Sequence, residues 1–130
     1  MHNHTVKIIN SGALTKSYFL KYIANNGTSG PGYYAEGLGH GMSNGLDAST
    51  MTHELSNTGT NAFTFARVPW TARTVGDDDT NSHPSFVGGK IDQAFFHNNR
   101  LGFLSAVFVS MSQAAQFFNM YHTSALTVTV

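Results

Sequence analysis

Residues 90–112 read KIDQAFFHNNRLGFLSAVFVSMS, two apolar runs on either side of the polar break His97-Asn98-Asn99-Arg100. Asparagine enters the left-handed backbone region more readily than most side chains, and the two-residue turns of β-hairpins need that region. The flanking runs are rich in phenylalanine and valine, which favour strands. The stretch therefore predicts an antiparallel β-hairpin centred on the two asparagines.

A second hairpin is predicted nearer the N-terminus. Residues 6–9 and 17–24 are rich in aromatic and β-branched side chains, as strands are. The loop that follows, NNGTSGPG at residues 25–32, contains Asn-Gly and Pro-Gly pairs, which supply the backbone angles that turns require. We expect residues 33–38, YYAEGL, to return as the partner strand.

A glycine-rich segment and a third hairpin lie in the middle of the chain. Residues 27–45 hold seven glycines, so we expect an irregular segment at the surface. Residues 50–55 and 62–68 alternate with period two, which is typical of strands. The turn SNTGTN at residues 56–61 would join these strands into a hairpin.

One short helix and a terminal strand complete the predicted fold. Ser112 is placed to cap an α-helix near residues 112–121, because Gln113, Ala114, Ala115 and Gln116 are good helix formers. Residues 124–130, SALTVTV, alternate again and predict a strand with an open edge. The expected fold is mainly β, with antiparallel hairpins and this one helix. At 130 residues we expect a single β-rich domain over residues 1–130, with the irregular segment at about 27–45.

Composition argues against several classes of protein. Charged residues make up 11% of the chain, against about 25% in ordinary soluble domains, and seven basic residues balance seven acidic ones. We therefore expect no nucleic-acid partner, because such binding needs a basic excess. No signal peptide or run of transmembrane length is found, so no integral membrane association is expected. The absence of cysteine excludes disulfides and thiolate sites.

The segment GDDDTNSHPSFVGG, residues 76–89, has the polar spacing of an ion site. Asp77-x-Asp79-x-Asn81 matches the first ligands of a calcium loop of the EF-hand kind. The pattern then fails, because Ser82 and Gly88 stand where the loop needs Gly and Glu. A calcium site and a turn built on Asx hydrogen bonds remain open, and the spacing favours the turn.

Catalytic and metal motifs are otherwise lacking in the sequence. The seven histidines are scattered, and no pair has the helical spacing with an intervening Glu that a metalloprotease needs. The chain has no G-x-S-x-G elbow, and any pair of carboxylates for glycoside hydrolysis would be chosen arbitrarily. We therefore expect no enzyme activity, no cofactor and no bound metal.

The central third of the chain resembles a known family. The residues that carry the likeness are Gly76, Asp77, Asp79, Thr80, Asn81, 84–88, Ile91, Phe95, Phe96 and 99–105. This pattern is similar to that of the tail tubular protein B, or nozzle, family of short-tailed bacteriophages. In weaker form the resemblance extends over nearly the whole chain, from about Val6.

The resemblance implies a structural protein of the virion. Members of the family form a hexameric ring at the tail tip, are much longer chains built mainly of β structure, and offer no catalytic residues to carry over. It also makes Asp77, Asp79, Thr80 and Asn81 a structural turn motif that leads into a strand at Phe86, with Asp78 left for solvent or a partner. Where the family has a polar turn, this chain has Ala106-Val107-Phe108, which indicates a local change of topology.

We therefore interpret the chain as a non-enzymatic, nozzle-like structural protein of a phage tail. It would be made in the cytoplasm of the bacterial host and would act in the virion, by self-association as a homo-oligomer or by assembly with other phage tail proteins. Candidate interface residues, whose alternative is a place in the core, are Phe103, Ala106, Val107, Phe108, Val109, Leu126, Val128 and Val130.

Two other functions are kept as alternatives. A receptor- or carbohydrate-binding module of a phage tail would use an exposed aromatic shelf, with Tyr33, Tyr34 and His40 as candidates. A small virion hydrolase has only scattered carboxylates in its favour.

Overall fold

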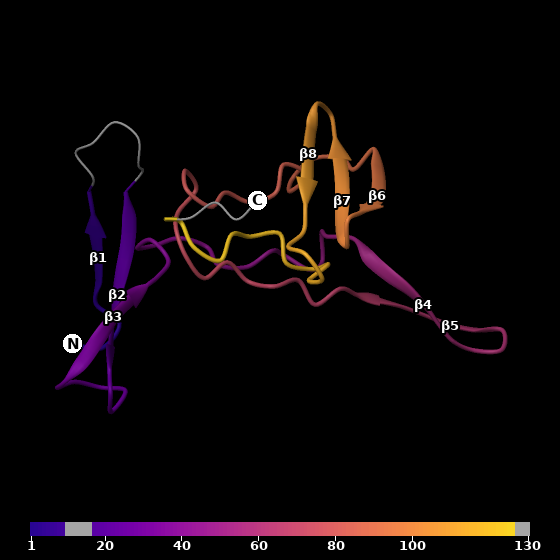
Figure 1. Ribbon diagram of the computed structural model, residues 1–130. Helices are drawn as coiled ribbons and strands as arrows, with labels where there is room; N and C mark the ends of the chain where they lie inside the picture. The colour runs from indigo at the N-terminus through magenta and orange to yellow at the C-terminus, as the bar shows by residue number, and fades with distance from the viewer. Residues whose placement is uncertain (10–16, 127–130) are drawn as a thin grey trace. The chain divides into compact units, whose positions relative to one another are not determined.

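The computed structural model describes residues 1–9 and 17–126 (Figure 1). Within these residues the chain forms strands without any helix, in three separate antiparallel sheets. The strands are β1 (Thr5–Ile8), β2 (Tyr18–Ala24), β3 (Gly32–Glu36), β4 (His53–Gly59), β5 (Ala62–Arg67), β6 (Gln93–His97), β7 (Arg100–Ser105) and β8 (Phe108–Met111). The predicted mainly β, antiparallel class is confirmed. No helix of the described residues is long and apolar enough to cross a membrane.

The first sheet has the order β1-β2-β3 and contains the predicted N-terminal hairpin. Between β2 and β3, the Oδ1 atom of Asn26 accepts hydrogen bonds from the backbone N–H groups of Thr28, at 3.0 Å, and Ser29, at 2.9 Å. Gly27 and Gly30 take positive φ angles of 75° and 92°. The Asn26-Gly27 pair thus closes this loop through the chemistry that the sequence indicates, whereas Gly32 of the Pro-Gly pair has no positive φ and begins β3.

The second sheet is the β4–β5 hairpin, whose pairing runs from His53 opposite Arg67 to Gly59 opposite Ala62. Its first strand continues four residues beyond the predicted end at Leu55. The turn is correspondingly tighter, and Asn61 occupies the left-handed region with a φ of 58°. A register shift between Asn57 and Gly59 marks an irregularity in β4.

The third sheet has the order β6-β7-β8, and its first turn is the one predicted from the two asparagines. Asn98 and Asn99 have φ angles of 47° and 59°, as a two-residue hairpin turn with the right twist requires. The predicted hairpin over residues 90–112 is therefore confirmed.

The chain also turns between β7 and β8, which contradicts the expected change of topology at Ala106-Val107-Phe108. Ala106 takes a positive φ of 52°, and its N–H group donates to Oδ2 of Asp92 at 2.9 Å. This carboxylate lies just before β6, and it holds the turn although Ala106 and Val107 are poor turn residues. The hairpin register thus decides the conformation here against the local side-chain preference.

The helix predicted near residues 112–121 is wrong. A helix needs N–H groups bonded four residues back, but here they bond to distant carbonyls: Ser112 to Leu101 at 2.8 Å, and Ala115 to Asn99 at 2.9 Å. Ala115 has a positive φ of 60°, and Gln113 forms an isolated bridge with Gln116. Ser112 caps nothing, because its hydroxyl accepts the N–H of Leu101 at 3.0 Å.

Phe86 lies in a turn rather than in the predicted strand. The N–H of Val87 donates to the carbonyl of Pro84, and the N–H of Gly89 to that of Phe86, each at 3.0 Å. The Phe86 ring is buried with Met51 and Phe103. Phe86 therefore contributes its ring to the core from a turn and not from a strand.

The chain divides into two compact units. The first unit is made of residues 1–44, 73–82 and 122–130, and the second of residues 45–72 and 83–121. In the second unit, Met51, Phe86 and Phe103 form the core, and Leu46, Trp70, Ile91, Leu101 and Met120 pack against it. Buried apolar side chains of the first unit are Phe19, Ala24 and Val75. That both units fold as one domain stays a prediction.

Candidate functional site

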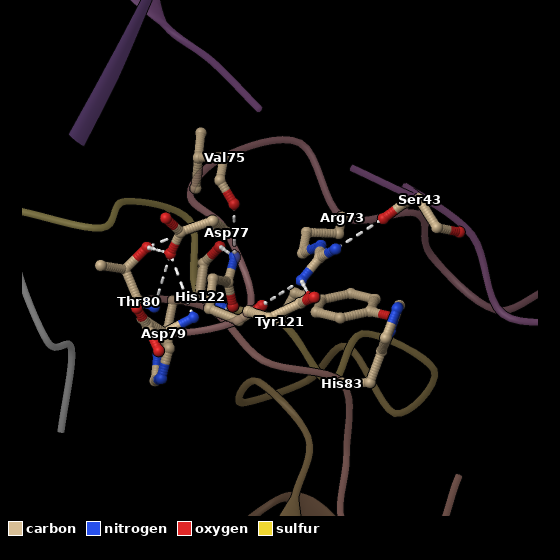
Figure 2. Close-up of polar contacts among 11 residues, drawn as sticks. Ser43, Arg73, Val75, Asp77, Asp79, Thr80, His83, Tyr121 and His122 are labelled. Carbon is tan, nitrogen blue, oxygen red and sulfur yellow. Dashed lines mark hydrogen bonds and ion pairs between the residues drawn. The ribbon is translucent and has the colours of Figure 1, made fainter. Parts of the chain in front are cut away.

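The aspartate run closes a tight loop around the side chain of Asp77 (Figure 2). Its Oδ1 atom accepts the backbone N–H of Asp79 at 3.1 Å, the N–H of Thr80 at 3.0 Å and the Thr80 hydroxyl at 2.9 Å. The Thr80 hydroxyl in turn accepts the N–H of Asp77 at 3.0 Å. This is the reciprocal geometry of an Asx turn, and it uses one carboxylate oxygen three times.

These hydrogen bonds set the charge state of Asp77. Partial burial opposes ionisation of the carboxylate, but the hydrogen bonds from Thr80 and Asp79 together outweigh it and hold the pKa of Asp77 below its usual value. The side chain is therefore a stable anion whose charge is already paired with N–H and O–H dipoles. It is poorly suited to act as a general acid, which needs a raised pKa.

Gly76 allows the segment to enter this loop. Its φ is 79°, and a Cβ atom there would lie 2.7 Å from Oγ1 of Thr80 and 2.9 Å from Cβ of Asn81. Gly76 also bridges to the glycine-rich segment: it accepts the N–H of Gly39 at 2.8 Å and donates to the carbonyl of Gly37 at 3.1 Å. Only glycine satisfies the positive φ and the close packing together.

Asn81 fastens the loop to the segment that begins at His122. The Asn81 side chain is 2% exposed, and its Nδ2 group donates to the carbonyls of Val75 and His122, both at 3.0 Å. Its Oδ1 atom accepts the N–H of His122 at 2.9 Å. All the donors of this amide are satisfied, so the buried polar group stabilises one specific arrangement of two distant segments.

Arg73 is a buried cation in the same unit, and sequence reasoning missed it. Its Nη1 atom donates to Oδ1 of Asp78 at 2.7 Å and to the carbonyl of Asn81 at 3.0 Å, and Nη2 donates to the carbonyl of Ser43 at 2.7 Å (Figure 2). The side chain of Arg73 is 1% exposed and that of Asp78 is 69% exposed. Asp78 is therefore exposed to solvent, as expected, but it is not left free, because it pairs with Arg73.

His83 forms a separate polar contact inside the second unit. Its Nδ1 atom lies 2.6 Å from the hydroxyl of Tyr121, and the two rings meet edge to face at 5.8 Å between centroids. Figure 2 shows the imidazole beside the buried phenol ring. The histidine is thus part of the packing before Phe86.

Most polar side-chain atoms of these residues bond within the fold, whereas Nε of Arg73 and Nδ1 of His122 are buried without a hydrogen-bond partner. Among residues 1–9 and 17–126, no group of three or more His, Asp or Glu side chains is placed to hold a metal ion. The arrangement positions chain segments against one another, and the motif residues Asp77, Thr80 and Asn81 are its centre. Asp79 contributes its backbone N–H to the loop.

A family model described as bacteriophage nozzle protein matches residues 1–129 of this chain. The chain belongs to the bacteriophage nozzle protein family. Tail tubular protein gp12 of Escherichia phage T7 is 34% identical over 124 residues, which cover 95% of this chain. The chain spans about 15% of the length of that relative. The resemblance predicted from residues 76–105 is confirmed.

The residues predicted as an interface in this nozzle-family chain differ in their exposure. Phe103 is 5% exposed and belongs to the core of the second unit, so it is not available at the surface of that unit. By contrast, Val107 is 88% exposed, and Ala106, Phe108, Val109 and Leu126 are also exposed. Val128 and Val130 lie outside the described residues.

Sequence reasoning missed a second exposed apolar group in this nozzle-family chain. Leu55, Phe63 and Phe65 on β4 and β5 are 63–70% exposed, although alternating phenylalanines on strands usually lie in a core. The period-two alternation was visible in the sequence, but it does not tell a covered face from an open one.

The aromatic shelf expected for a receptor-binding module is not formed by Tyr33 and Tyr34. The two are neighbours in β3, so their side chains point to opposite faces of the sheet. The Tyr34 ring packs against Tyr22 across the strand pair, with 5.1 Å between ring centroids. The nozzle family and this geometry together do not favour the receptor-binding alternative.

Proposed function

We propose that this chain is a structural segment of a bacteriophage tail nozzle, and that it works in the virion by assembling with copies of itself or with other tail proteins. The observation that carries the proposal is the nozzle-family match over residues 1–129. The named relative is a tail tubular protein, which is consistent with a role in the tail.

The polar chemistry of the chain supports an architectural role without catalysis. The carboxylate of Asp77 is spent on an Asx turn, the amide of Asn81 on His122, and the guanidinium of Arg73 on Asp78 and two carbonyls. These groups hold segments in place. A protein of this kind contributes shape and contact surface to a particle.

Exposed apolar residues supply the surface that such a protein needs. Ala106, Val107, Phe108 and Val109 follow one another at the turn between β7 and β8, and all four are exposed. Burial of apolar area stabilises an interface by about 25 cal/mol per Å². We therefore keep these four residues as the proposed assembly surface and drop the buried Phe103.

The test is the mass and shape of the purified chain, by light scattering and electron microscopy. We expect defined assemblies well above the 14.1 kDa of one chain. Replacing Val107 with Ser should shift the population toward smaller species, whereas the matched change Ser49→Ala, at an exposed position in an irregular loop, should not. A compact monomer at all concentrations, and no binding to tail proteins, would contradict the proposal.

A further inference from the structure

Two asparagines of the chain, Asn26 and Asn44, are followed directly by glycine. An Asn-Gly pair can rearrange without an enzyme, because the backbone nitrogen of the glycine can attack the side-chain amide carbon of the asparagine. Glycine favours this reaction, since it has no Cβ atom to obstruct the succinimide ring that forms. The reacting groups of the two pairs are the same, so a difference in their reactivity has to come from the fold.

The fold restrains the first pair. Oδ1 of Asn26 accepts the backbone N–H groups of Thr28, at 3.0 Å, and Ser29, at 2.9 Å, and also the hydroxyl of Thr28 at 3.1 Å. The N–H of Gly27, whose nitrogen would have to attack, donates to the carbonyl of Ala24 at 2.9 Å. Several hydrogen bonds must therefore open before Asn26 can react, which lowers the reactive fraction of molecules.

The second pair lies open to solvent. Asn44 is exposed, and within the described residues its side-chain amide makes no hydrogen bond. Gly45 is exposed as well, its φ is not positive, and its Cβ position has open space around it. Asn44 also lines a cavity of about 520 Å³ in the first unit. The pair therefore has room both for ring closure and for the water that must follow.

Arg73 holds the carbonyl of the reacting peptide bond. Its backbone N–H donates to the carbonyl oxygen of Asn44 at 2.6 Å, and its Nη2 donates to the neighbouring carbonyl of Ser43 at 2.7 Å (Figure 2). When the nitrogen of Gly45 loses its proton, the negative charge is shared with the Asn44 carbonyl oxygen. A donor that is already aimed at this oxygen stabilises the anion that attacks.

We propose that Asn44 is a site of spontaneous covalent modification, and that it converts to aspartate and isoaspartate in the folded chain while Asn26 is preserved. The deprotonated nitrogen of Gly45 bonds to Cγ of Asn44, the Cγ–Nδ2 bond breaks, and ammonia leaves with a proton from water. Water then opens the succinimide ring. Opening at Cγ gives aspartate, and opening at the main-chain carbonyl gives isoaspartate. One water is consumed and one ammonia released, without any oxidation or reduction.

The carboxylate that forms would enter a cavity with two cations. Lys21 and Arg73 line this cavity, and within the described residues Lys21 belongs to no ion pair. The acidic residue of the cavity, Glu36, already accepts the hydroxyl of Ser124 and the N–H of Ala125. Nearby positive charge favours the anionic product. The formal net charge of the chain, which is zero, falls by one with each conversion.

Peptide mapping by mass spectrometry tests the inference on the full-length chain, after incubation in mildly alkaline buffer. Conversion of an amide to an acid changes the peptide mass, and labelling by an isoaspartyl methyltransferase identifies the isoaspartate. We expect Asn44 to convert roughly tenfold faster than Asn26, because the hydrogen bonds of Asn26 must open first. In concentrated urea the two rates should agree within about twofold, since only the fold separates the two pairs.

Gly45→Ala is the matched variant, because the open space and the absence of a positive φ allow a Cβ atom there. Its circular dichroism should equal that of the parent, whereas conversion at Asn44 should slow by roughly tenfold as the methyl group obstructs ring closure. Equal rates at the two pairs in the folded chain, or a faster rate at Asn26, would overturn the inference. An unmodified Asn44 in the folded chain, under conditions that convert it in urea, would overturn it too. These readouts do not depend on assembly, so they are independent of the proposed function.

Discussion

Asn81 joins two segments that lie far apart in the sequence, and it does so with its whole side-chain amide. Two carbonyls accept its Nδ2 protons, and Oδ1 receives the N–H of His122. The residue is 2% exposed, so water cannot replace a lost partner. A change that reverses one end of the amide therefore leaves buried carbonyls without donors.

Asn81→Asp should lower the free energy of unfolding by about 3 kcal/mol or more, because a carboxylate would face the carbonyls of Val75 and His122 in a buried place. Urea unfolding followed by circular dichroism measures this. Asn57→Asp is the control: Oδ1 of Asn57 only accepts the N–H of Gly59, at 2.9 Å, and the site is exposed. It should change stability by less than about 0.5 kcal/mol, and equal losses in both variants would refute the role given to Asn81.

Local spacing predicted part of this site but not its long-range contacts. The Asp77 turn involves partners two and three residues away, so it was visible in the order of residues 76–81. The partners of Asn81 and Arg73 include His122 and Ser43, which lie 41 and 30 positions away. No periodicity encodes such pairs. The ion pair of Asp78 with Arg73 joins residues only five positions apart, and it was not suspected either.

At the scale of elements, the turn between β7 and β8 carries a conformational strain. Ala106 has a φ of 52°, in the left-handed region that a Cβ atom disfavours by about 1–2 kcal/mol. The turn persists because Asp92 accepts its N–H and because strand pairing fixes both ends. The strain can therefore be relieved by replacing Ala106 alone, while Asp92 and the pairing of β7 with β8 stay as they are.

Ala106→Gly should raise the free energy of unfolding by about 0.5–1 kcal/mol, since the steric relief exceeds the extra entropy of glycine in the unfolded chain. Denaturant unfolding followed by Trp70 fluorescence reports on the same unit. Ala114→Gly is the control and should change the free energy of unfolding in the opposite direction. Ala114 is also exposed in a turn, but its φ is not positive, so glycine relieves no strain there. We expect a loss of about 0.5–1 kcal/mol there, and a gain in both variants would exclude strain as the cause.

The elements differ in how well they can be predicted from their own sequences. Asn98 and Asn99 specify their turn because left-handed conformations are an intrinsic preference of asparagine. Residues 112–121 have helix-forming side chains, yet their N–H groups are taken by residues such as Leu101 and Asn99. A weak local propensity of a few tenths of a kcal/mol per residue yields to such tertiary hydrogen bonds. The helix was therefore mispredicted where long-range contacts decide.

For the whole molecule, the division into two units bears on how cooperatively it unfolds. The chain passes between the units at residues 44–45, 72–73, 82–83 and 121–122 without a long linker. At 130 residues its length suits a single domain. We therefore expect the units to unfold together although each has its own buried residues.

Trp70 allows a direct test, because it is the single tryptophan and lies in the second unit. Asn81→Asp disturbs only the first unit, at Val75 and His122. If the chain is one domain, the unfolding midpoint seen by Trp70 fluorescence should fall as far as the midpoint seen by circular dichroism. An unchanged fluorescence midpoint beside a lowered dichroism midpoint would show two independent domains.

The bond between Asn81 and His122 also has a consequence for the order of events during synthesis. The two residues are separated by 41 positions. At 5–20 residues per second, a ribosome needs roughly 2–8 s to add that stretch. Throughout this interval Asn81 lacks the backbone partner that His122 provides in the folded chain. Residues 1–44 and 73–82 of the first unit are thus completed only after residues 83–121 of the second unit have been made.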